Sequence, residues 1–150
     1  MAANIYPIYT IKPRIDSAGA IVGPSASTAT DGTGANATRI FTAGAATGSF
    51  VYKVIFKPVA TTAATVARVF YCSDTGTFTP GTTNTVANSS MIGEVTLAAW
   101  AASNTTASQQ QEMPVNFPIP ANTKLFVTFG TSTGAAGNGY NPIVIAGDYE

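Results

Sequence analysis

Glycine and proline interrupt this chain so often that no amphipathic helix of useful length fits between them. The 150 residues include 14 glycines and 9 prolines, and the segments between these are rich in Thr, Val, Ile, Phe and Tyr. Such residues favour strands, and short runs of them between turn residues are typical of β-proteins. The chain is therefore expected to be all-β.

The clearest expected strand is SFVYKVIFKP at residues 49–58, which alternates with a period of two and ends at a proline. We expect one of its faces to be buried, with Phe50, Tyr52, Val54 and Phe56 in the core. Lys53 and Lys57 then point away from the core. Two other alternating segments supply further core side chains, which are Val69, Leu125, Val127 and Phe129.

Further expected strands follow at short intervals, at residues 37–43, 65–72, 91–99, 112–120, 123–131 and 141–149. In the segment 112–120 the prolines alternate on the outward face, which predicts an edge strand. Seven or eight short strands with turns between them predict an antiparallel two-sheet β-sandwich of jelly-roll type. An Ig-like sandwich is the alternative, although the single cysteine leaves no pair for its disulfide.

The length suits one domain with an extended N-terminal arm. We assign residues 36–150 to the sandwich, and residues 1–35 to an N-terminal arm or edge strand with a flexible loop. The apolar part of this segment carries Ile5, Tyr6, Ile8, Tyr9 and Ile11. It is either an edge strand of the core or an arm that lies on a neighbouring subunit.

The chain offers little for catalysis. It contains no histidine, which excludes Ser-His-Asp and Cys-His systems and removes the usual general base. Cys72 lies in an expected strand without an activating neighbour, so we expect a buried, inert thiol. The carboxylates are scattered along the chain and match no calcium loop or paired acid and base. We expect a protein that is not an enzyme and has no cofactor or metal.

Charge is sparse and balanced. Charged residues make up 9% of the chain, with seven basic and seven acidic side chains. This predicts no binding to nucleic acid, and no apolar run is long enough to span a membrane. A chain with so little net charge is prone to self-association. The surface is therefore either that of a tolerant Ala/Thr-rich β-protein or one that partners largely cover.

The central block, TDGTG at 30–34 followed by ATRIFTAGAATGSFVYKVIFKPVATTAATVARVFY at 37–71, resembles a known group. The phrases GEVTLAAWAAS, MPVNFPIPANTKLFVTFGT and VIAGDY continue the likeness. The group comprises small β-rich capsid decoration (cement) proteins of tailed bacteriophages. The resemblance covers roughly residues 28–149 and leaves the N-terminal arm outside.

The resemblance implies a virion protein on the outer capsid surface, assembled in the host cytoplasm, often as a trimer. Its partners would be the major capsid protein and further copies of itself, with neighbouring capsid proteins bridged mechanically. The residues expected at the partner interface are Ile5, Tyr6, Ile8, Tyr9, Ile11, Lys12, Arg14, Lys53, Lys57 and Arg68. Arg68 is either an interface cation or a buried, paired arginine. The alternative function is a head-fibre or tail-tip adhesin that binds host glycans or proteins through aromatics in loops 73–90 and 130–141.

Overall fold

The computed structural model describes residues 12–18, 23 and 25–149. Within these residues the elements are strands joined by turns and loops. The strands are β1 (Lys12–Ser17), β2 (Thr38–Thr42), β3 (Ser49–Pro58), β4 (Thr65–Cys72), β5 (Ser89–Leu97), β6 (Gln111–Ile119), β7 (Lys124–Phe129) and β8 (Tyr140–Asp148). The described residues include no helix that is long and apolar enough to cross a membrane. The all-β prediction is confirmed.

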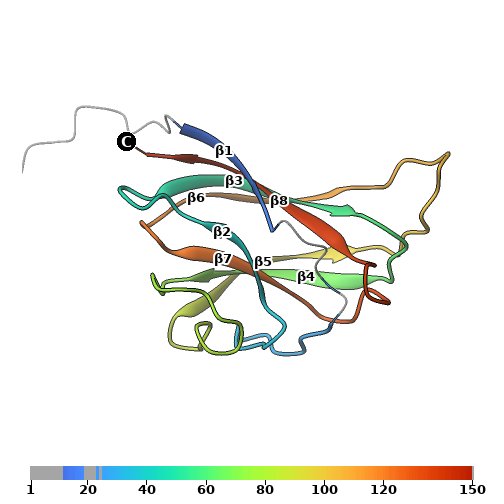
Figure 1. Ribbon diagram of the computed structural model, residues 1–150, viewed down its shortest axis with the longest axis horizontal. Coiled ribbons are helices and arrows are strands. Elements are labelled where there is room, and N and C mark those ends of the chain that lie inside the picture. Colours follow the sequence, from blue (N-terminus) through green and yellow to red (C-terminus); the bar gives the residue numbers. More distant parts are fainter. Residues whose placement is uncertain (1–11, 19–22, 24, 150) are drawn as a thin grey trace, which may run out of the picture.

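The strands form two antiparallel sheets packed face to face (Figure 1). Sheet A has the order β1-β8-β3-β6, and sheet B has the order β2-β7-β4-β5. Strand 1 pairs with 8, 2 with 7, 3 with 6 and 4 with 5. This pairing arises when one long antiparallel hairpin is rolled into two sheets, as in a jelly roll. The predicted sandwich is confirmed, and its strand order is that of the jelly roll.

The core lies between the two sheets. Of the side chains predicted to be there, Val54, Phe56, Val69, Leu125, Val127 and Phe129 are at most 2% exposed. The prediction for the start of β3 is wrong, because Tyr52 is 42% exposed and Phe50 is only partly buried. A β-bulge between Val51 and Lys53 shifts the register there. Because a bulge interrupts the alternation of sides, Val51 becomes the fully buried residue.

Strand β6 lies at one edge of sheet A, as its prolines predict. Met113 and Ile119 are buried, while Pro114, Asn116 and Pro118 are exposed. Asn116 has a φ of 54°, in the left-handed region that strand residues avoid. An edge with two residues that lack an N–H is a poor template for a further strand.

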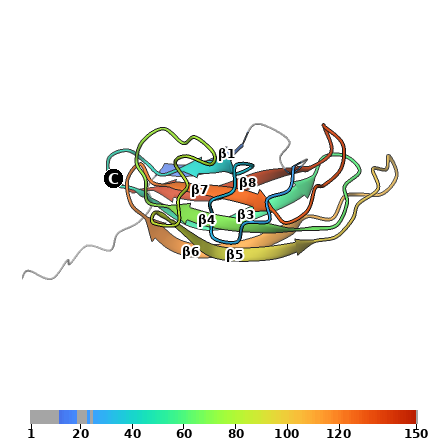
Figure 2. The ribbon, with the colours of Figure 1, turned by 90° about the horizontal axis from the view of Figure 1, so that it is seen from below.

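The two sheets differ in what covers their outer faces. Over sheet B, Phe70 and Phe126 stack with ring centroids 5.0 Å apart, and Phe78 lies 5.4 Å from Phe126. Phe78 belongs to the segment 73–88, which folds back below sheet B together with the described residues of 25–36 (Figure 1). Figure 2, which views the molecule from below, shows both segments in front of β4 and β7. The segment 73–88 therefore buries one side against sheet B.

Candidate partner-binding surface

The outer face of sheet A carries a group of four isoleucines. Ile15 lies directly opposite Ile145, and Ile143 lies directly opposite Ile55. Residues opposite each other in a ladder share a face, and so do residues two apart in one strand. Ile15, Ile55, Ile143 and Ile145 are therefore contiguous, and we name them the isoleucine patch. Ile15 is 75% exposed, and the other three are partly buried by their neighbours in the sheet.

These four isoleucines are not among the residues predicted for the interface. The sequence nevertheless carries a signal for them, because Ile143–Val144–Ile145–Ala146 is a continuous apolar run and not an alternating one. Such a run indicates a strand with apolar side chains on both faces. Val144 and Ala146 point into the core, so the isoleucines must point out.

An ion pair, a further lysine and two aromatic rings flank the isoleucine patch. The Lys53 Nζ donates to Glu112 Oε2 at 2.8 Å, across the pairing of β3 with β6. Lys57 is exposed near one end of β3, and among the described residues no carboxylate forms an ion pair with it. Near the other end, the rings of Phe50 and Tyr52 lie 4.9 Å apart at 58°. The outer face of sheet A is thus largely apolar, with one ion pair, one lysine and one aromatic pair.

Tyr149 follows β8 beside this aromatic pair. Its backbone N–H donates to the carbonyl of Gly48 at 3.2 Å. Burial raises the pKa of the Tyr149 phenol above its usual value, and the neighbouring Tyr52 raises it further. The Tyr149 phenol is therefore neutral at physiological pH.

The structure brings together only part of the predicted interface. Lys53 and Lys57 share the outer face of sheet A. Lys12 and Arg14 lie on the opposite side of β1 from Ile15, because side chains alternate along a strand. The predicted residues Ile5, Tyr6, Ile8, Tyr9 and Ile11 lie outside the described residues.

Arg68 lies on the other sheet and does not join the lysines in one surface. Its side chain is 17% exposed, with Nε 3.5 Å from Glu94 Oε2. Nη1 donates to the carbonyl of Ser27 at 3.4 Å, from the segment that covers sheet B. Arg68 therefore corresponds to the paired arginine, and the prediction that placed it with Lys53 and Lys57 is wrong. The cause is tertiary, since residues 41 positions away cover it.

Arg14 holds the seam between the edge strands β1 and β2. Its guanidinium lies 4.8 Å from the centroid of the Phe41 ring and donates to the Thr42 carbonyl and to Asp148 Oδ1, both at 3.1 Å. It is also paired with Asp16. A polar cavity of about 250 Å³ opens beside it and is also lined by Arg39. Because its hydrogen bonds join both sheets, Arg14 closes the seam and has little capacity left for a partner.

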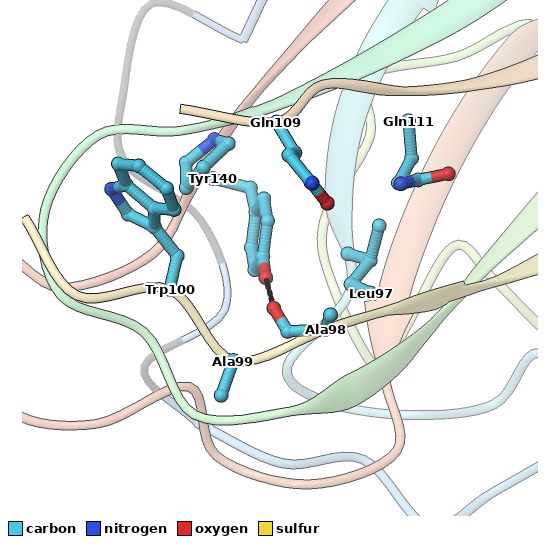
Figure 3. A pocket seen from close by; sticks show the side chains of 8 residues that line it. Leu97, Ala98, Ala99, Trp100, Gln109, Gln111 and Tyr140 are labelled. Carbon is cyan, nitrogen blue, oxygen red and sulfur yellow. Dashed lines mark hydrogen bonds between the residues drawn. The ribbon is translucent and has the colours of Figure 1, made fainter. Parts of the chain in front are cut away.

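A second hollow lies at one end of the sandwich, between Trp100, Tyr140 and the glutamines 109 and 111 (Figure 3). The Tyr140 hydroxyl donates to the Ala98 carbonyl at 3.1 Å, so the ring is fixed in the wall. The volume is about 20 Å³, enough for about one water molecule and too small for a sugar ring.

The loops named for the adhesin alternative do not present their aromatics outward. Phe78 packs on Phe126, and Tyr140 is 2% exposed. Among the described residues, no three His, Cys, Asp or Glu side chains cluster as a metal site would require. The outer face of sheet A is the most extensive candidate site on the described part of the molecule.

No family model matches the chain, and no curated protein matches it significantly. Two solved structures of infectious bursal disease virus are similar to it, each with 16% sequence identity. For the T13 viral particle the match covers 99% of this chain and 35% of the viral chain, with a TM-score of 0.37. For the Gx strain it covers 97% and 34%, with a TM-score of 0.32. The chain spans about a third of either viral chain, and the jelly-roll assignment rests on its own strand order.

Proposed function

We propose that this protein is a non-enzymatic structural component of a virion, which decorates the outer capsid surface and bridges neighbouring major capsid proteins. The observation that carries the proposal is the asymmetry of the sandwich. The chain covers the apolar outer face of sheet B with its own segments, while the apolar outer face of sheet A carries an isoleucine that is 75% exposed. A face of this kind is typical of a protein that works by assembling with others.

The physical requirements of decoration agree with the rest of the molecule. A bridging protein needs a rigid scaffold and wide contacts, and it needs no reactive group. Each of the described strands pairs with at least one other, and the two sheets enclose a common core. With 9% charged residues, contacts between this chain and a shell desolvate few charges. Several contacts made at once multiply weak affinities into stable attachment. The shell as partner is what the sequence resemblance implies.

The test is to add the purified protein to shells that lack it. We expect saturable binding and a shell that withstands higher temperature or stronger osmotic shock. Shells already saturated with the protein serve as the control and should bind no more. Absence of binding to shells, together with binding to host cells, would overturn the proposal in favour of an adhesin.

A further inference from the structure

No described segment packs over the isoleucine patch, and the geometry of the face points to what would cover it. We infer that the outer face of sheet A is the surface through which two copies of this chain pack against each other. The inference deepens the proposed function and rests on it in one respect, namely that the protein acts through protein–protein contacts. It departs from the trimer that the sequence resemblance implies.

The size of the face is sufficient for a pair. The strands lie about 4.8 Å apart and rise about 3.3 Å per residue, and β1, β8, β3 and β6 have 6, 9, 10 and 9 residues. The face therefore measures about 540 Å² per copy, or about 1,100 Å² for the pair. That total exceeds the roughly 1,000 Å² that a specific interface should bury.

The two ends of the face are complementary to each other. Lys57 lies near one end of β3, and the Phe50–Tyr52 ring pair lies near the other. Two copies can stack these faces about a two-fold axis that lies midway between the sheets and perpendicular to the strands. The strands of the second copy then run antiparallel to those of the first. Each Lys57 then lies over the partner's aromatic pair, where the ring faces attract a cation. The same operation keeps the two Lys57 side chains far apart.

The register also places apolar side chains opposite each other. Ile15, Ile145 and Lys53 form one row across the sheet, and Ser17, Ile143 and Ile55 form the next row. With the axis between these rows, Ile145 of one copy meets Ile143 of the other, the aliphatic part of Lys53 meets Ile55, and Ile15 meets Ser17, each in both directions. Stacked sheets with nearly aligned strands pack about 10 Å apart, which lets these side chains interdigitate. Such a self-complementary patch is what an isologous contact requires.

The first experiment measures the oligomeric state of the full chain in solution, without any shell. Sedimentation equilibrium and light scattering should show a dimer that dissociates on dilution. Ile15→Lys should raise the dissociation constant at least about tenfold, because it places a charge in the contact. Ile15 is highly exposed on an edge strand, so the fold should survive, as circular dichroism would verify. The matched control is Val86→Lys, at a 66% exposed apolar residue outside sheet A, which should leave the constant unchanged.

The second experiment locates the contact by cross-linking. Cys72 is fully buried, so under native conditions a short bis-maleimide should react only with an introduced cysteine. Ile15→Cys should yield a cross-linked dimer, and Val86→Cys should not.

Several outcomes would overturn the inference: a monomeric wild type, a trimer, equal effects of the two lysine variants, or equal cross-linking of the two cysteine variants. These outcomes are separable from those of the decoration proposal. A dimer that binds no shell refutes decoration and supports the inference, whereas a monomer that binds shells does the reverse.

Discussion

Asn84 fastens the cover of sheet B, and its truncation should loosen that cover. The side chain is 1% exposed. Its Nδ2 donates to the carbonyls of Gly32 and Gly34, the latter at 3.1 Å, and its Oδ1 accepts from the Gly81 N–H at 2.7 Å. These bonds join the segment after β1 to the segment after β4, which together cover Phe70 and Phe126. The perturbation is Asn84→Ala.

The magnitude follows from the groups left behind. Asn84→Ala leaves the buried Gly32 carbonyl without this donor, whereas the Gly34 carbonyl still accepts from the Ala37 N–H at 3.2 Å and the exposed Gly81 N–H can turn to water. A buried group without its partner costs about 1 kcal/mol or somewhat more, and the two weakened bonds add about 1 kcal/mol together. We therefore expect the free energy of unfolding to fall by about 2 kcal/mol, which for a domain of this size lowers Tm by about 6 °C. The cost exceeds that of an exposed hydrogen bond because water does not reach the Gly32 carbonyl freely.

Urea unfolding measures the global effect, and the reactivity of Cys72 measures the local one. Cys72 is fully buried in the cluster beneath the cover, so its thiol should react with a maleimide faster in Asn84→Ala than in the wild type. The matched control is Asn36→Ala, since Asn36 Nδ2 donates to the Ala26 carbonyl at 2.7 Å on the exposed surface. This control should cost about 0.5 kcal/mol. Equal losses for the two variants, or unchanged thiol reactivity, would refute the reasoning.

Three further predictions concern β3 and its ends. Gly48→Ala should lower the free energy of unfolding by about 3 kcal/mol, because φ is +85° and a Cβ would meet the backbone carbonyl at the end of β6. The control Gly137→Ala, at φ +90° in open space, should cost about 1 kcal/mol, and equal Tm shifts of the two variants would contradict this. Val51→Ala should lower the free energy of unfolding by about 2 kcal/mol and Tyr52→Thr by about 0.5 kcal/mol, because the bulge buries Val51 and exposes Tyr52. Both variants are unfolded at the same low protein concentration, and the reverse order of the two losses would contradict the bulge. The raised pKa of Tyr149 contributes stability that is complete below pH 10 and declines as pH rises through the folded-state pKa. Absorbance titration should show the Tyr149 phenol ionising at a higher pH than a free tyrosine, and at a lower pH in Tyr52→Phe than in the wild type; an unchanged titration would refute the coupling.

Local pattern was sufficient to predict β2 to β8 and the sandwich, whereas β1 was not predicted as a strand of its own. Strong alternation, prolines on one face of β6 and turn residues between segments are all short-range signals. The segment predicted at 112–120 is observed at Gln111–Ile119, at an edge as its prolines indicate. The pairing of first strand with last is long-range, and only the three-dimensional structure shows it.

The error at the start of β3 has a specific cause. Phe50, Tyr52, Val54 and Phe56 are each two residues apart in the sequence, so a regular strand would place all four on one face. The bulge adds one residue to β3 between Val51 and Lys53, after which the sides exchange. No glycine marks this bulge, and Phe50, Val51 and Tyr52 beside it are all apolar, so the sequence offered no signal for it.

The apolar side chains of this chain form three layers, whereas a sandwich with solvated outer faces needs only one. The first lies between the sheets. The second lies outside sheet B, at Phe70 and Phe126, and the chain covers it with its own segments. The third lies outside sheet A, where the bulge adds Phe50 and Tyr52 to the isoleucines. No described segment packs over this third layer, and a solvated isoleucine that is 75% exposed is unfavourable by about 1–2 kcal/mol relative to burial. The described segments therefore bury the second layer and leave the third open, and the third is the surface that the proposed contact between two copies would cover.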